Sequence, residues 1–69
     1  MTIKVYSVIQ HNEWANPGAW VAVDENGYIV WTQTNPDYDT TRIYFDENRE
    51  YFNIANYKSA NFVYEYDEE

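Results

Sequence analysis

Sixty-nine residues make one small domain, and because the chain has no cysteine, disulfide bonds and thiolate metal sites are excluded. Twelve acidic and four basic residues give a net charge of −8, which repels nucleic acid and anionic membranes and favours a basic protein surface as partner. Since no apolar run approaches the roughly 20 residues that span a bilayer, and the first residues do not resemble a signal peptide, we expect a cytoplasmic protein.

The apolar residues are mostly aromatic or β-branched. Eight Tyr, three Trp and three Phe are present, and each can bury about 150–250 Å² of surface. Val and Ile accompany them, whereas Leu, the commonest residue of helix cores, is absent. This composition predicts a mainly β domain of five or six short antiparallel strands, with a barrel-like closure as one form of the sheet.

The first residues of the chain predict one strand and one loop. Apolar residues recur on both sides of the extended chain over residues 2–10, which predicts a strand. Residues 11–19 follow as a loop, because Asn16-Pro17-Gly18 is a strong turn signal. Trp14 lies in this loop, and since an exposed tryptophan is a good anchor for a partner, it is a candidate contact residue.

Residues 20–34 predict a β-hairpin, since Asn26-Gly27 between two β-rich runs is the strongest short-range hairpin signal. A two-residue turn gives the pairs Val23–Val30, Ala22–Trp31 and Val21–Thr32. The faces are then Trp20, Ala22, Ile29 and Trp31 on one side, and Val21, Val23, Tyr28 and Val30 on the other. A four-residue turn over Asp24–Gly27 would shift these pairs but keep the faces, whereas a three-residue loop with a bulge would break this assignment. Both faces are apolar, so the hairpin is either buried on both sides or presents one aromatic face to a partner.

Residues 35–39 predict a second turn, followed by a strand at 40–45, but residues 46–58 are ambiguous. As a helix, they place their apolar residues within about 160° of the helical wheel, with Asp46 as N-cap. As a hairpin, the DENR residues form the loop between two short strands. We favour the strands, and an α+β domain with one helix at about 46–58 packed on an antiparallel sheet is the alternative.

The last residues, FVYEYDEE, alternate aromatic and acidic side chains. In a strand over residues 61–66, one side carries Phe62, Tyr64 and Tyr66, and the other carries Val63, Glu65, Asp67 and Glu69. Side chains two residues apart on one face are spaced about 6.6–6.8 Å, so the acids form a row. We therefore expect order through Tyr66, with the rings packed and the acids outward.

No residue pattern indicates an enzyme, a metal site or a bound cofactor. The one histidine, His11, lies in a polar loop, and neither Ser7 nor Ser59 has the surroundings of a catalytic nucleophile. The acids of residues 35–46 match part of a calcium-loop frame, but the turn glycine and the bidentate Glu of that frame are missing. We expect a non-enzymatic protein without metal or cofactor.

The excess of acid over base indicates a specific function. Carboxylates placed where nucleic acid carries phosphates can occupy a nucleic-acid-binding groove and block it. In size and charge, the chain resembles the small acidic inhibitors that phages use against host nucleic-acid enzymes, which implies a phage-encoded DNA mimic. We predict a protein-binding module that blocks a basic site on a nucleic-acid-binding protein. Its contact residues are Asp37, Asp39, Asp46, Glu47, Glu50, Glu65, Asp67, Glu68 and Glu69, with Trp14, Tyr38 and Tyr66 as aromatic contacts.

Two other interpretations stay open. The acidic residues can serve solubility alone. The chain can also be a structural or assembly subunit that self-associates, as a homodimer for example, or docks through the aromatic face of Trp20 and Trp31. Direct contact with nucleic acid or with a membrane is not expected in any of these cases.

Overall fold

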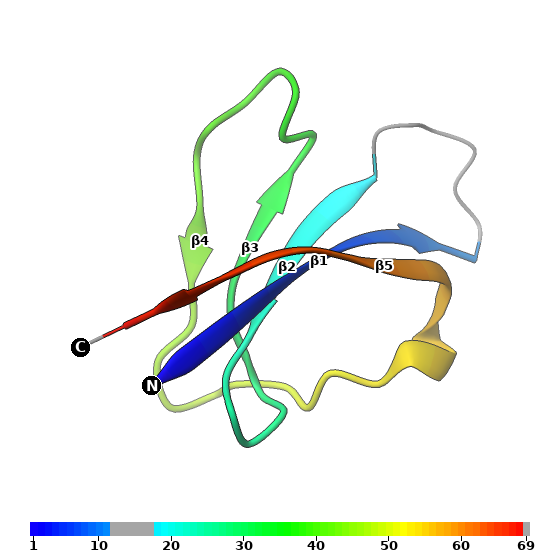
Figure 1. Cartoon of the computed structure of the whole chain (residues 1–69). Helices are drawn as coiled ribbons and strands as arrows, with labels where there is room; N and C mark the ends of the chain where they lie inside the picture. The colour runs from blue at the N-terminus through cyan, green and yellow to red at the C-terminus, as the bar shows by residue number, and fades with distance from the viewer. Residues whose placement is uncertain (12–17, 69) are drawn as a thin grey trace.

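The computed structural model describes residues 1–11 and 18–68, which form one five-stranded antiparallel sheet (Figure 1). Its strands are β1 (Thr2–Gln10), β2 (Ala19–Val23), β3 (Ile29–Thr34), β4 (Ile43–Tyr44) and β5 (Tyr57–Asp67), and a short 3₁₀-helix, η1 (Ile54–Asn56), precedes β5. The order across the sheet is β4-β3-β2-β1-β5, so β4 and β5 form its two edges. The prediction of a mainly β domain is confirmed, and within the described ranges the sheet is open rather than closed into a barrel.

One face of the sheet, which we call the Trp31 face, carries the buried residues Ile3, Val5, Ala22, Val30 and Trp31. Tyr64 and Tyr66 of β5 close this face, with Trp20 beside them. The Tyr66 hydroxyl accepts a 2.8 Å hydrogen bond from Trp31 Nε1, and the Arg42 guanidinium lies 4.0 Å from the centroid of the Trp31 ring. The chain itself covers Trp31, which is only 1% exposed, whereas Trp20 is half-buried.

The opposite face, which we call the Val8 face, carries the buried residues Val8, Val21, Val23 and Ile29. Phe52, from the segment that leads into β5, and Tyr57, the first residue of β5, pack against this cluster together with Tyr6 of β1. The Phe52 ring stacks on Tyr6 at a centroid distance of 5.0 Å and lies 5.5 Å from the Tyr57 ring. Both faces of the predicted hairpin are apolar because a different part of the chain buries each one.

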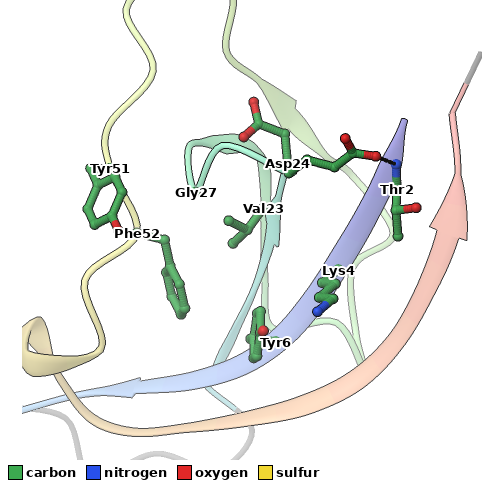
Figure 2. A pocket seen from close by; sticks show the side chains of 9 residues that line it. Thr2, Lys4, Tyr6, Val23, Asp24, Gly27, Tyr51 and Phe52 are labelled. Atoms are coloured by element: carbon green, nitrogen blue, oxygen red, sulfur yellow. Dashed lines mark hydrogen bonds between the residues drawn. The ribbon is translucent and has the colours of Figure 1, made fainter.

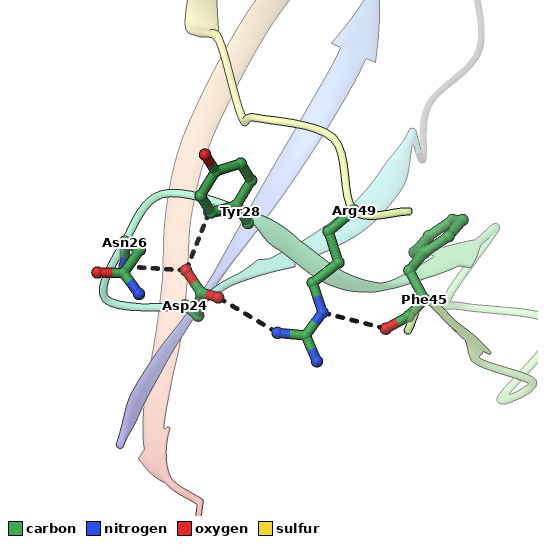
Figure 3. A network of polar contacts seen from close by, with 5 residues as sticks. All are labelled: Asp24, Asn26, Tyr28, Phe45 and Arg49. Atoms are coloured by element: carbon green, nitrogen blue, oxygen red, sulfur yellow. Dashed lines mark hydrogen bonds and ion pairs between the residues drawn. The ribbon is translucent and has the colours of Figure 1, made fainter. Parts of the chain in front are cut away.

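The β2–β3 turn is a three-residue loop, residues 25–27, fixed by the carboxylate of Asp24 (Figure 3). The Gly27 N–H donates a 3.1 Å hydrogen bond to the Asp24 carbonyl and so closes the loop. The φ of Gly27 is 90°, a conformation that glycine adopts without steric cost. Asp24 Oδ1 accepts from the backbone N–H groups of Asn26 at 2.9 Å and Tyr28 at 3.0 Å. Asp24 Oδ2 lies 3.4 Å from Arg49 Nη1. One largely buried carboxylate thus joins the turn to a distant segment of the chain.

The hairpin register agrees with the prediction away from the turn and differs beside it. The confirmed pairs are Ala22–Trp31 and Val21–Thr32. Val23, however, pairs with Ile29, which leaves Val30 as the extra residue of a β-bulge. The predicted faces are therefore wrong for two residues, since Ile29 joins the Val8 face and Val30 joins the Trp31 face.

Residues 43–52 run in one direction along the side of β3 that faces away from β2. Beyond β4, the backbone hydrogen bonds are Phe45 N–H to Val30 O at 3.0 Å, Ile29 N–H to Glu50 O at 2.9 Å, and Phe52 N–H to Gly27 O at 2.8 Å. Residues 46–49 leave the sheet edge between the first two of these bonds. Neither the helix at about 46–58 nor the DENR hairpin forms, because bonds to β3 replace bonds within the segment, and the helical geometry there is limited to η1.

β5 pairs with β1 along its length, with one register shift near its start, at Lys58, and another near its middle. Tyr64 pairs with Val5, and the next pair is Phe62 with Tyr6, so Val63 is the extra residue. The Phe62 ring consequently lies 5.9 Å from the Tyr6 ring, on the Val8 face. The predicted C-terminal strand is confirmed. Two predictions for Phe62 are wrong, because it does not share a face with Tyr64 and its side chain is 54% exposed rather than packed.

Candidate protein-binding surface

β5 carries two exposed acids at the end of the sheet where β1 begins. The register pairs Glu65 with Lys4 and Asp67 with Thr2. Directly opposite residues of an antiparallel pair share a face, so both acids lie on the same face as Lys4 and Thr2. Asp67 Oδ1 also accepts a 3.1 Å hydrogen bond from the Thr2 hydroxyl. Glu65 and Asp67 of the predicted row are thus attached to a regular, paired part of the sheet.

Two further acids lie beside them. Glu25, from the β2–β3 turn, accepts a 2.7 Å hydrogen bond at Oε1 from the Thr2 N–H. Glu68 exchanges two backbone hydrogen bonds with Met1, because its N–H donates to the Met1 carbonyl at 2.7 Å and its carbonyl accepts from the amino group at 2.9 Å. We call this group the acidic end, and its members are Glu25, Glu65, Asp67 and Glu68.

Glu25 was missing from the contact residues predicted from the sequence. The structure brings it to Thr2 because β1 and β2 are antiparallel and Lys4 pairs with Val23. Glu25, two positions after Val23, therefore lies beside Thr2, two positions before Lys4. The Asn-Gly turn locates Glu25 within the hairpin, but the β1–β2 register depends on a pairing across residues 11–18, and no local pattern specifies it.

A groove of about 390 Å³ adjoins the acidic end (Figure 2). Its lining residues are Thr2, Lys4 and Tyr6 from β1, Val23, Asp24, Glu25 and Gly27 from the hairpin, and Tyr51 and Phe52. The Tyr51 ring lies so close to Gly27 that a Cβ at Gly27 would approach it to 2.7 Å. Aromatic walls with carboxylates at the margin suit the aliphatic stem and positive head of a lysine or arginine side chain.

A second group of predicted contact residues lies at the opposite edge of the sheet. Asp46 and Glu47 are exposed in the loop that leaves the β3 edge, and Glu50 follows where the chain returns. Glu50 and Tyr57 line a smaller cavity of about 190 Å³ together with Ile29. Burial raises the pKa of the Tyr57 hydroxyl, and the negative charge of Glu50 raises it further. The structure therefore does not join these acids to the row on β5.

Asp37, Tyr38 and Asp39 lie in the loop between β3 and β4, at the end of β3 away from the β2–β3 turn (Figure 1). Asp39 is used locally, since its Oδ1 accepts a 2.9 Å hydrogen bond from the Thr41 N–H and its carbonyl accepts one from Gln33 Nε2 at 2.7 Å. Hydrogen bonds from the backbone and then the side chain of Thr41 lower the pKa of Asp39. These three residues are separate from the acidic end.

The other predicted contact residues divide into two cases. Tyr66 is half-buried, and its hydroxyl is bonded to Trp31, so it closes the Trp31 face rather than adding open contact area. Trp14 and Glu69 lie outside the described residues. Of the predicted acids, the structure brings together Glu65, Asp67 and Glu68, and it adds Glu25 to them.

Comparisons with known proteins give no further indication, because no family model, curated protein or solved structure matches this chain. Within residues 1–11 and 18–68, no group of three acidic or histidine side chains gathers as a metal ion would require. No helix among the same residues is long and apolar enough to cross a membrane. His11 bonds through Nε2 to the Ala55 carbonyl at 3.1 Å, which connects the end of β1 to η1. The acidic end and its groove are the features on which a function can be argued.

Proposed function

We propose that this chain is a non-enzymatic protein-binding module that blocks a basic site on a nucleic-acid-binding protein. The observation that supports this most is the acidic end, where the β2–β3 turn and β5 bring four carboxylate residues to the start of β1. Lys4 and the amino group of Met1 are the positive charges beside them among the described residues. The acidic end therefore keeps an excess of negative charge on an exposed surface.

The sheet holds this charge in place before a partner arrives. Glu65 and Asp67 are two residues apart on one strand face, a separation of about 6.6–6.8 Å, and cross-strand pairing with β1 fixes both backbones. The Lys and Arg side chains of a site that binds phosphates form strong charge-assisted hydrogen bonds with carboxylates as well. Because little main-chain order has to be created on binding, the entropic cost is reduced. Long-range attraction also accelerates association and weakens with added salt.

The groove supplies a second reason for a protein partner. Tyr6, Tyr51 and Phe52 offer ring surface in the groove that Glu25 also lines. An Arg or Lys side chain can bury its stem against rings while its charge meets a carboxylate. With the likeness in size and charge to phage inhibitors, we extend the proposal to a phage-encoded inhibitor. The lack of cysteine suits a reducing cytoplasm.

A capture experiment with two charge-matched variants tests the proposal. The immobilised protein is exposed to nuclease-treated bacterial lysate, and each captured protein is tested for nucleic-acid binding and for displacement by duplex DNA. We expect capture of nucleic-acid-binding proteins that DNA displaces, and loss of capture in the Glu65→Gln/Asp67→Asn variant. The Asp37→Asn/Asp46→Asn variant removes the same amount of charge elsewhere and should retain capture. Equal capture by both variants, or no competition by DNA, would show that the proposal is wrong.

A further inference from the structure

β5 is a long edge strand with an unused side. It spans eleven residues, and within the described part of the chain it pairs with β1 alone. The other edge strand, β4, has two residues and is followed by a loop that leaves the sheet. An edge strand presents a row of main-chain N–H and C=O groups with no partner, and proteins recognise extended peptides by adding them to such an edge.

The hydrogen-bond pattern shows which residues of β5 direct their main-chain groups outward. Met1 and Glu68 exchange both of their backbone hydrogen bonds. Bonded and non-bonded pairs alternate along an antiparallel ladder, so the pairs of Thr2 with Asp67 and Lys4 with Glu65 are non-bonded. The Thr2 N–H agrees with this, because it points away from β5 and donates to Glu25. The main-chain groups of Glu65 and Asp67 therefore face the open side of the sheet.

The same two residues carry the exposed carboxylates of the acidic end. A strand that paired with them would receive main-chain hydrogen bonds and would place its own side chains directly opposite the two carboxylates. Basic residues at every second position of that strand would match both. A second copy of this chain is a poor match, because each copy carries a net charge of −8.

We propose that the outer edge of β5 binds an extended segment of the basic partner as a sixth strand, with Lys or Arg at alternate positions opposite Glu65 and Asp67. This inference rests on the proposed function and specifies how the acidic end recognises its partner. The main chain supplies the register, and the carboxylates select basic residues at alternate positions. A partner whose basic residues are scattered over helices could also pair with the carboxylates. It would leave the main-chain N–H and C=O groups of β5 without hydrogen-bond partners.

Peptide binding followed by amide hydrogen exchange tests this inference. Four peptides serve as probes. The first is an eight-residue peptide of alternating Lys and Val, and the second has the same composition with its Lys residues grouped together. The other two are the alternating peptide with N-methyl groups on the odd-numbered residues or on the even-numbered residues. With the alternating peptide, we expect slower exchange at the Glu65 and Asp67 amides. One N-methylated peptide should bind about tenfold more weakly, as expected for the loss of two ordinary hydrogen bonds, and the other should bind normally.

The outcomes separate this inference from the proposed function. If all four peptides bind equally, with salt dependence but without protection of the two amides, strand addition is wrong and the acidic surface stands. If no basic peptide binds in a salt-dependent way, both the inference and the proposed function are wrong. Protection of the Glu65 and Asp67 amides that depends on protein concentration without any peptide would show pairing with a second copy and would overturn the inference.

Discussion

The β5 edge and the β2–β3 turn of the sheet use acidic residues in different ways. In the turn, Asp24 is 9% exposed, accepts two backbone hydrogen bonds and pairs with Arg49. On the β5 side, Glu65 and Asp67 are exposed, and Asp67 accepts one hydrogen bond from the Thr2 hydroxyl. The first carboxylate is neutralised inside the fold, while the other two keep their field on the surface.

This difference shows that the negative charges of this chain are not all equally available to a partner. A buried carboxylate is tolerated when hydrogen bonds and a cation compensate for its lost hydration. An exposed carboxylate needs no such compensation and can pair with an incoming cation. Substitutions at Asp24 should therefore change stability, whereas substitutions at Glu65 and Asp67 should change binding.

The largest effect is expected from Trp31→Ala, which removes the side chain that connects β3 with β5. Replacing a buried tryptophan by alanine costs about 3–5 kcal/mol of unfolding free energy, and the substitution also removes the donor to the Tyr66 hydroxyl. Urea denaturation followed by circular dichroism measures the loss. The control is Tyr44→Ala on β4, where the ring is 65% exposed, and it should change the free energy by less than about 0.5 kcal/mol. Equal losses would contradict the closure of the Trp31 face by β5.

A smaller loss, about 2 kcal/mol, is expected from Asp24→Ala, because two backbone N–H groups lose their acceptor and Arg49 loses its partner. The ion pair contributes the minor part, since Arg49 is 38% exposed and solvent screens it. Asp24→Asn keeps the acceptor oxygen and should lose less than half as much in the same denaturation experiment. Wild-type stability in Asp24→Ala would show that this carboxylate does not fix the turn.

Tyr66→Phe should cost about 1 kcal/mol, because Trp31 Nε1 then lacks its acceptor while the ring of residue 66 keeps its packing. Tyr28→Phe is the matched control, as Tyr28 is 43% exposed and its ring contacts Tyr51 at a centroid distance of 5.9 Å. The control should change the unfolding free energy by less than about 0.5 kcal/mol. A loss as large in Tyr28→Phe would mean that the Trp31 hydrogen bond contributes little.

The sequence predicted the hairpin because its signals are local. Asn26-Gly27 and the β-rich runs around it specify the pairs of Ala22 with Trp31 and Val21 with Thr32. The three-residue loop with a bulge was the case that would break the predicted faces, and local signals did not select it because the loop is stabilised by the Asp24 carboxylate. The Asp24 carboxylate thus determines which face of the sheet Ile29 occupies and which face Val30 occupies.

Features that depend on distant pairing could not be predicted in the same way. The bulge at Val63 arises where β5 pairs with β1, far away in the sequence. Residues 46–58 have an amphipathic helical pattern, yet bonds to β3 at Glu50 and Phe52 prevail over that local preference. Glu25 entered the candidate surface for the same reason, since only the β1–β2 register brings it to Thr2.

The double variant Glu65→Gln/Asp67→Asn should unfold within about 0.5 kcal/mol of the wild type, because both side chains are exposed and the change removes two of the excess negative charges. Urea denaturation at neutral pH provides the comparison with Asp24→Ala. A loss above about 1 kcal/mol would place these two acids, like Asp24, within the stabilising network of the fold.

The smallest effect concerns Tyr57 at alkaline pH. Its pKa is raised above 10.0 by burial and by Glu50, so the folded state favours the neutral hydroxyl. The resulting stability is present below pH 10.0 and is lost as the pH rises through the folded pKa. As the pH rises above 10.0, the wild type should therefore lose more stability than Tyr57→Phe. Parallel losses in the two proteins would contradict this assignment.

The central claim is that the carboxylates of β5 bind a basic partner, and the salt dependence of affinity tests it most directly. The dissociation constant for the alternating Lys and Val peptide is measured over a range of ionic strength for the wild type, for Glu65→Gln/Asp67→Asn and for Asp37→Asn/Asp46→Asn. We predict steep weakening with salt in the wild type, a nearly flat and weak response in the β5 variant, and wild-type behaviour in the other variant. Identical salt dependence in the two variants would contradict the claim.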